Sequence, residues 1–417
     1  MISALLLLGI LAMILFNVAQ RAQAFPSLWR RSGLTLTRRA SIVLLAVLML
    51  LVVNGCKKTE YGETAGNKLV VGMLAPLTGS GARFGESQRN GVQLAMEQIN
   101  SKGDVDGHNL ELVVEDTKTE PPTAVTAFTR LAERKDVVAI FGSAASLDVP
   151  AYLPQVDRAG IPHLLPVAVL PKITEMGSKF TFRSALNDKI AAQKIADFAV
   201  QRLGAKKVAL LIEDSAFGET GLIFGDEAKR LGVAPLTVER FKRGDIDIKP
   251  QLTKIQSTGA THIQFWGYYA EYALVAKQLQ ELGYHATLMG NQAPVNDKTI
   301  ELGGAALEGA LNICLFVPTS PAPGIRGFVD AYRARFGAAP DTWAAQSYDG
   351  MKLLADAIRR GGATREGIRK ALAVTTDFEG VTGTITFMDN GDAAFRGTSV
   401  VEVSGGKFVP FRGVASQ

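Results

Sequence analysis

The sequence predicts an α/β protein made of two doubly wound parallel-sheet lobes, which a hinge of three chain segments joins. The tetrapeptide FGES at 84–87 returns as FGET at 217–220, and each copy follows a short apolar run and opens a helical pattern. Short apolar runs alternate with helical periods from residue 68 onward, which is typical of a parallel sheet with helices on both faces. This alternation restarts near residue 180, so we expect two such sheets.

The first lobe begins with an apolar strand at 68–74 and a helix near 85–102. The apolar residues of that helix, from Val92 to Ile99, follow the spacing of one buried helical face. The next elements are expected as a strand at 110–115, a helix at 121–135, a strand at 137–141, a helix at 147–159 and a strand at 162–165.

The second lobe repeats this pattern. Helices are expected at 188–203, 219–231, 249–257 and 271–282, with strands at 207–212, 236–241, 262–266 and 287–290 and an apolar run at 310–317. Three more helices follow at 325–336, 344–360 and 365–372, and the tail is typical of strands and turns. Because these late helices have no sheet of their own, we expect them to pack on the first lobe, and the tail to return to the second.

The predicted division of the chain follows from this pattern. It assigns 1–56 to an apolar N-terminal region with a lipoprotein signal, 57–67 to a linker, 68–184 with 318–377 to lobe 1, and 185–317 with 378–417 to lobe 2. The chain would then cross between the lobes three times, and hinged lobes that close on a ligand are a common arrangement. Open sheets bind ligands at the carboxyl ends of their strands, so Phe84 and Phe217 are expected on opposite walls of one cleft.

The charge of the chain argues against a nucleic-acid binder. The net charge is +5, and the composition is 47% hydrophobic and 20% charged, as in ordinary globular proteins. Of the 45 basic residues, five are arginines within 1–56, which leaves 40 to balance the 40 acidic residues. The folded part therefore has no excess of positive charge, and no nucleic-acid partner is expected.

The N-terminal region is predicted to be a secretion signal. An unbroken apolar run at 40–53 follows two arginines and ends before Asn54, Gly55 and Cys56, which resembles the lipobox of bacterial lipoproteins. Cys56 would then be lipidated, which leaves Cys314 as a buried strand residue without a disulfide partner. A plain membrane anchor is the alternative, but the run is shorter than the roughly 20 residues that span a bilayer. A second apolar run at 2–18 fits either an extra transmembrane segment or a misplaced start.

Six short motifs stand in order along the chain: GMLAPLTG at 72–79, GVQLAMEQINSKG at 91–103, FGSAAS at 141–146, AGIP at 159–162, FGE at 217–219 and WGYYAE at 266–271. With these motifs, the sequence from residue 68 to 411 resembles the leucine/isoleucine/valine-binding protein family, the solute receptors of bacterial ABC importers. Their order and spacing carry the resemblance, since no single motif is specific. It implies the type I periplasmic binding protein fold.

The resemblance also implies where a ligand carboxylate would bind. The serine that grips the ligand's α-carboxylate falls on Ser146, near the start of a predicted helix, where free N–H groups and the helix dipole favour an anion. A plain N-cap role for Ser146 stays open beside this one. The family's threonine in the following loop falls on Val169, which has no hydroxyl, so the backbone at Val167 is expected to contribute there.

The remaining ligand positions fall on Phe84, Phe217, Tyr268 and Gln292. The two phenylalanines replace tyrosines of the amino-acid binders, and neutral Gln292 stands where the family has the acid that pairs with the ligand's ammonium. A hydrogen bond to a charged group contributes about 1.5–3 kcal/mol, and an unpaired buried ammonium is costly. Val169 and Gln292 therefore each weaken the expectation of a free α-amino acid. The ligand expected is a small amino-acid-like, carboxylate or amide molecule with a less polar body.

Two acids nearby in the sequence, Glu271 and Asp214, could replace the missing charge. Acids on helix surfaces are common, however, so neither has a specific signal.

No catalytic group assembles in the sequence. The glycine-rich segment 79–84 lacks the last residue of the dinucleotide fingerprint, and the S-x-x-K match at 404–407 lies between tail strands. The four histidines, His108, His163, His262 and His285, have no metal-ligand spacing. We expect neither an enzyme nor a metal or other cofactor.

The predicted function is an extracytoplasmic solute-binding receptor of an ABC importer of the branched-chain amino acid type. It would work as a monomer, anchored by lipid at Cys56 in the periplasm or on the outer face of a bacterial membrane, with permease subunits as partners. A ligand sensor of the same fold, coupled to a signalling partner, is the alternative.

Overall fold

The computed structural model describes residues 68–102, 105, 107–396 and 399–411. The predicted signal, the lipidation site Cys56 and the linker at 57–67 lie outside these residues. Within the described part, no helix is both long enough and apolar enough to cross a membrane.

The first sheet has five parallel strands. They are β1 Lys68–Ala75, β2 Asn109–Asp116, β3 Val137–Phe141, β4 His163–Leu165 and β5 Thr181–Arg183. Their spatial order is β2-β1-β3-β4-β5. β1 and β3 are buried along almost their whole length, which explains why both read as unbroken apolar runs in the sequence. The helices between these strands are α4 Ala82–Ser101, α5 Pro121–Glu133, α6 Val149–Ala159 and α7 Lys172–Glu175.

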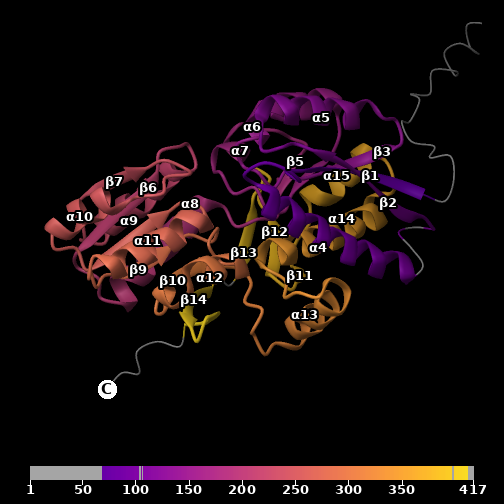
Figure 1. Ribbon diagram of the computed structural model, residues 1–417. Coiled ribbons are helices and arrows are strands. Elements are labelled where there is room, and N and C mark those ends of the chain that lie inside the picture. Colours follow the sequence, from indigo (N-terminus) through magenta and orange to yellow (C-terminus); the bar gives the residue numbers. More distant parts are fainter. Residues whose placement is uncertain (1–67, 103–104, 106, 397–398, 412–417) are drawn as a thin grey trace, which may run out of the picture. The chain divides into compact units, whose positions relative to one another are not determined.

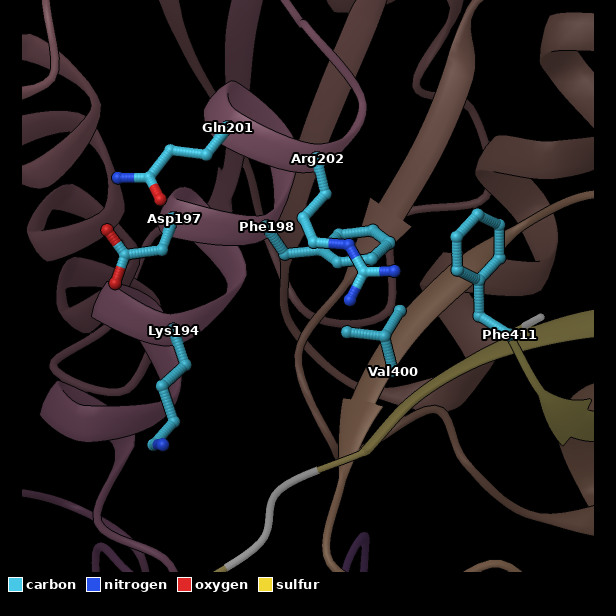
Figure 2. Close-up of a pocket in the computed structure, with 7 residues that line it drawn as sticks. All are labelled: Lys194, Asp197, Phe198, Gln201, Arg202, Val400 and Phe411. Atoms are coloured by element: carbon cyan, nitrogen blue, oxygen red, sulfur yellow. The ribbon is translucent and has the colours of Figure 1, made fainter. Parts of the chain in front are cut away.

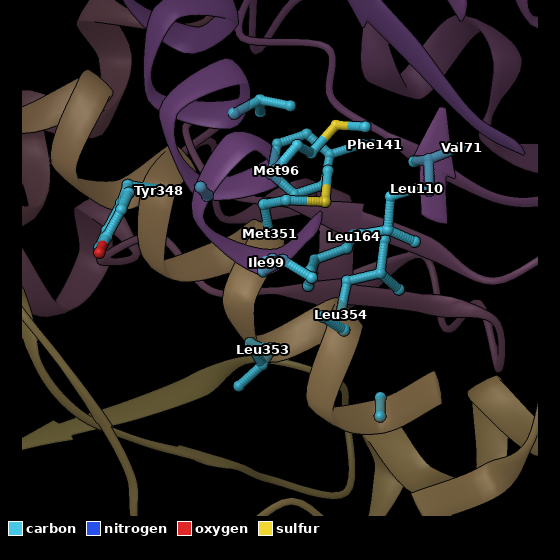
Figure 3. Packing of buried hydrophobic residues seen from close by; sticks show 14 of the residues in the cluster. Val71, Met96, Ile99, Leu110, Phe141, Leu164, Tyr348, Met351, Leu353 and Leu354 are labelled. Carbon is cyan, nitrogen blue, oxygen red and sulfur yellow. The ribbon is translucent and has the colours of Figure 1, made fainter. Parts of the chain in front are cut away.

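Three late helices pack on the elements of the first sheet. They are α13 Pro323–Phe336, α14 Thr342–Gly361 and α15 Arg365–Ala373. α14 lies beside α4 (Figure 1), and the two contact so closely that a Cβ on Gly91 would collide with the carbonyl oxygen of Ala344. Figure 3 shows the core that this pairing closes, with Met96 and Met351 against strand residues such as Phe141.

The second sheet has seven strands. They are β6 Val208–Glu213, β7 Val238–Phe241, β8 His262–Trp266, β9 Thr287–Gly290, β10 Leu311–Cys314, β14 Ser399–Ser404 and β15 Lys407–Pro410. Their order is β15-β14-β10-β9-β8-β6-β7, and β14 and β15 run antiparallel to their neighbours. The α/β class with two sheets is thus confirmed, although the second sheet is mixed and not purely parallel. Cys314 is the buried strand residue expected, at 0% exposure.

The helices of the second sheet differ in detail from the prediction. They are α8 Asp188–Asp197, α9 Leu222–Arg230, α10 Lys249–Ser257, α11 Tyr269–Glu281 and α12 Asp297–Gly303. The helix predicted at 188–203 ends in a π-helical turn, Phe198–Arg202, and the one predicted at 219–231 begins as a 3-10 turn, Gly218–Gly221.

The tail divides between the two halves of the molecule. β11 Phe378–Gly380, β12 Gly383–Phe387 and β13 Ala393–Arg396 form a separate antiparallel sheet. The buried side chains of this sheet, such as Ile385, belong to the core of α4 and α14. The prediction assigned the whole of 378–417 to lobe 2, whereas only β14 and β15 join the second sheet. The lobe boundaries as moving units remain a prediction.

A buried ion pair holds the first crossing of the chain, between β5 and α8. Arg183 is fully buried, and its Nε lies 2.6 Å from Oδ1 of Asp392, in the loop between β12 and β13. The same guanidinium donates to the carbonyl of Leu170 (2.6 Å) and to the hydroxyl of Thr174 (2.8 Å). Asn187, the N-cap of α8, donates to the other oxygen of Asp392 (3.0 Å). The start of α8 is thereby tied to the third sheet.

Candidate ligand-binding site

Two equivalent turns position Phe84 and Phe217 after β1 and β6. In each turn a glycine follows the phenylalanine and lies against a backbone carbonyl at the end of the preceding strand. A Cβ on Gly85 or on Gly218 would collide with that carbonyl oxygen, so no larger residue fits there. The repeated FGE motif therefore marks the same close backbone approach in both halves.

The predicted aromatic residues meet in one cluster. The ring of Tyr268, directly after β8, lies 5.4 Å from that of Phe84 and 4.8 Å from that of Phe217, measured between centroids. Trp343 packs edge-on against Phe84 at 4.5 Å. Phe84 is only 6% exposed and Phe217 only 2%. Aromatic residues that follow strands of both sheets thus pack into one apolar cluster, and its role as a ligand site remains a prediction.

The ring of Tyr268 also contacts a cation. The guanidinium of Arg243 lies 4.0 Å from the centre of the Tyr268 ring, within the range of a cation–π contact. Arg243 also pairs with buried Glu213 at 2.8 Å, so this contact is itself anchored in the second sheet.

The two acids considered as replacement charges have other roles. Glu271 is buried and its Oε1 accepts the N–H of Gly244 (2.9 Å), whereas Asp214 is exposed.

Ser146 lies on the loop between β3 and α6. Its Oγ accepts the N–H of Val169 (2.9 Å), which leaves its own O–H free to donate. Within the described residues, no hydrogen bond engages the backbone N–H groups of Ser146 and Val167. The N-cap of α6 is Asp148, so the plain capping role for Ser146 is wrong. A hydroxyl and two N–H groups are thus available here for an anion.

Gln292 lies next to an acid that sequence reasoning did not consider. Its Nε2 donates to the carbonyl of Leu186 (3.2 Å) and to Oδ1 of Asp188 (3.4 Å). Asp188 is 0% exposed, and neither its Oδ2 nor Oε1 of Gln292 has a hydrogen-bond partner among the described residues. Burial raises the pKa of Asp188 to about 7, although the hydrogen bond from Gln292, the charge of Arg183 and the nearby indole N–H of Trp266 oppose the shift. The backbone N–H of Asp188 also bonds to the carbonyl of Val169 (3.1 Å), which links this acid to the Ser146 loop.

Three residues of the site were missed by sequence reasoning: Asp188, Trp343 and Arg243. Asp188 is the first residue of α8, and an acid in a first helical turn has the same sequence signal whether it is exposed or buried. Trp343 reaches Phe84 from α14, far along the chain. Only the tertiary structure reveals these contacts.

One cavity, of about 320 Å³, lies away from these residues beside α8. It is lined by Lys194, Asp197 and Arg202 together with Val400 and Phe411, and Figure 2 shows Arg202 extending towards Val400. In the described part of the chain, no group of three or more His, Cys, Asp or Glu residues is placed to hold a metal ion.

The sequence model of the family "Periplasmic binding protein" matches residues 68–407, most of the chain. The chain belongs to this family. Its members are solute-binding proteins and not enzymes, and the family implies an extracytoplasmic location. This binding protein is the substrate-binding component of an ABC transporter of the branched-chain amino acid type, as predicted.

Relatives support this assignment. A "Leu/Ile/Val-binding protein homolog 3" of Brucella melitensis is 27% identical over 358 residues, which cover 84% of this chain and 95% of that protein. The structure of a leucine-binding protein from Thermotoga maritima is similar with a TM-score of 0.76 at 31% identity, covering 82% of this chain and 97% of that one. A branched-chain amino acid binding protein from Streptococcus pneumoniae, solved with isoleucine, gives 0.75 at 28% identity with the same coverage.

Proposed function

We propose that this binding protein takes up a free α-amino acid with an apolar side chain, which lies against the cluster of Phe84, Phe217 and Tyr268. The observation that carries the proposal is Asp188, a buried acid with one oxygen unpartnered beside Gln292. An ammonium group that donates to Asp188 would satisfy this oxygen and compensate a buried charge. Asp188, at the start of α8, thus takes the place of the acid that the family has at position 292.

The carboxylate of the ligand would bind at the Ser146 loop. The O–H of Ser146 and the N–H groups of Ser146 and Val167 supply donors there. Val169 offers an apolar contact in place of a hydroxyl, and its backbone connects the two ends of the site because it bonds to both Ser146 and Asp188.

The apolar body of the ligand would lie against the aromatic cluster. Phe84, Phe217 and Tyr268 present ring faces and edges without a charged group of their own. The relatives from Thermotoga maritima and Streptococcus pneumoniae, named for leucine and solved with isoleucine, support an aliphatic side chain.

Calorimetric titration with leucine, leucinamide and 4-methylpentanoate tests the proposal. The amide lacks the carboxylate and the acid lacks the ammonium. We expect leucine to bind at least about tenfold more tightly than either, because each loses a charge-assisted hydrogen bond. Ser146→Ala should weaken leucine several-fold. Equal affinity for leucine and 4-methylpentanoate would rule out the amino-acid assignment in favour of a carboxylate ligand.

Membrane attachment and transport complete the proposed function. Lipidation at Cys56 would hold the protein at the membrane, where it delivers ligand to permease subunits. Incorporation of labelled palmitate, compared between the wild type and Cys56→Ser, tests the anchor. An unlabelled wild type would contradict it.

A further inference from the structure

We propose that a cavity of about 240 Å³, separate from the amino-acid site, binds a small monocarboxylate with an apolar body. Its walls come from the start of α12 and the segment before it, from the crossing after β10, from the loop between α13 and α14, and from the turn between β14 and β15. None of the predicted ligand residues lines it.

The floor of the cavity is apolar. Val295, Phe316 and Phe408 line it and are each less than a tenth exposed, and Ile300 and Pro340 add to it. A buried cavity of about 150 Å³ already accepts a benzene ring, so this one has room for a six-carbon chain and a head group.

Two unpaired cations mark the rim. Arg333 and Lys407 line the cavity and are exposed, and no ion pair joins either of them to an acid in the described part of the chain. Both acids of the cavity are already engaged by Arg83, whose guanidinium lies 2.8 Å from Asp297 and 3.5 Å from Asp341. Arg83 offsets only one of these two carboxylates, but Arg333 and Lys407 are the charged groups of the lining that no described ion pair engages, which suits an anionic head group. Apolar walls and two cations without an ion pair together select a carboxylate on a short hydrocarbon.

The cavity adjoins the amino-acid site through Arg83. This residue precedes Phe84, and Asp297 and Asp341, its partners, come from α12 and from the N-cap of α14. A molecule that contacts both segments would favour the arrangement in which they lie together. By linkage, the carboxylate would strengthen the binding of the amino acid by the same factor by which the amino acid strengthens the binding of the carboxylate.

Calorimetry with hexanoate, and with hexanamide as the neutral counterpart, tests the inference on the whole protein. We expect saturable binding of hexanoate to the wild type and to Ser146→Ala alike. Binding should be at least about tenfold weaker for hexanamide and for the double variant Arg333→Gln, Lys407→Gln, because a charged hydrogen-bond partner is lost. Both replaced side chains are exposed, so this variant should keep the thermal midpoint of the wild type.

A second variant makes the test independent of charge. Ala339→Leu places extra carbon atoms in the cavity and should also abolish hexanoate binding. It does so by filling the cavity, whereas the double variant leaves the cavity open and removes only the two charges. Failure of the wild type to bind hexanoate would overturn the inference. So would binding that is lost in Ser146→Ala but retained in the double variant, since the hexanoate would then occupy the amino-acid site.

Discussion

Replacing Asp188 by asparagine should stabilise the ligand-free protein at alkaline pH and at the same time weaken its binding of an amino acid. Asp188 is completely buried, and its Oδ2 lacks a partner in the described structure. A carboxylate in such a place is unfavourable when it is charged, unless a ligand ammonium compensates it. Asparagine has the same shape but no charge.

The magnitude follows from the pKa of Asp188, which burial raises from 3.8 to about 7. Between these two values the folded chain holds a proton that the unfolded chain has released, so the stability of the fold decreases as pH rises through this window. Above about pH 7 the full effect amounts to about 4 kcal/mol of unfolding free energy, at 1.36 kcal/mol per pKa unit. Below about pH 4 both states are protonated and the effect vanishes.

Urea denaturation of wild type and Asp188→Asn, from about pH 4 to about pH 8, measures this difference. The gain in stability of the variant should be near zero at the acid end and should grow to several kcal/mol at the alkaline end. Asp214→Asn is the matched control, since Asp214 is exposed and its removal should not change the pH dependence. With saturating leucine the advantage of Asp188→Asn should disappear or reverse, because the wild type gains an ion pair with the ligand.

Parallel stability curves for wild type and variant across the whole pH range would refute the reasoning about Asp188. The carboxyl would then be solvated or paired in solution. Unchanged leucine affinity in the variant would separately remove Asp188 from the ammonium site.

Three further predictions concern the interior and the contacts between the lobes. Arg183→Met should destabilise the fold by about 3–5 kcal/mol in urea denaturation, since it leaves Asp392 buried without its cation; a cost below about 1 kcal/mol would contradict the role of this pair. Gly91→Ala should cost about 1–3 kcal/mol because its Cβ meets Ala344 of α14, whereas Gly327→Ala, with open space around it in α13, should be neutral or stabilising. Arg83→Gln and Asp297→Asn should each weaken leucine binding about twofold to fivefold, and more at low salt. The double variant should bind leucine no more weakly than either single variant. Additive losses of affinity would show that the two residues act separately.

The regular part of the fold could be predicted because its signal is local. Strands such as β1 and β3 are buried on both faces and therefore read as continuous apolar runs. The FGE repeat was equally informative, since a glycine that touches a strand end is a constraint within one turn. The positions of the three aromatic residues could be anticipated as well, since Phe84, Phe217 and Tyr268 each follow a strand and open sheets bind ligands at the carboxyl ends of their strands.

The remainder depends on contacts between distant segments. β11–β13 are short and half-buried, and nothing local indicates that Ile385 packs against α14 and not against the second sheet. From the sequence, neutral Gln292 indicated a site without an acid to pair with a ligand ammonium. The acid beside it, Asp188, could not be found in this way because it lies 104 residues earlier in the chain. Trp343 likewise joins Phe84 only after α14 has packed on α4.

The pairing of α4 with α14 has a consequence for how the polypeptide matures. Ser87 in α4 bonds to Asp341 at 2.6 Å, and Gln98 bonds to Tyr348 at 2.6 Å, across about 250 residues of intervening chain. The earliest strands to leave the ribosome or the secretion channel therefore wait for one of the last helices, while β6–β10 can assemble from a contiguous stretch. We therefore expect the N-terminal half, although it is synthesised first, to complete its core only after α14 has been made.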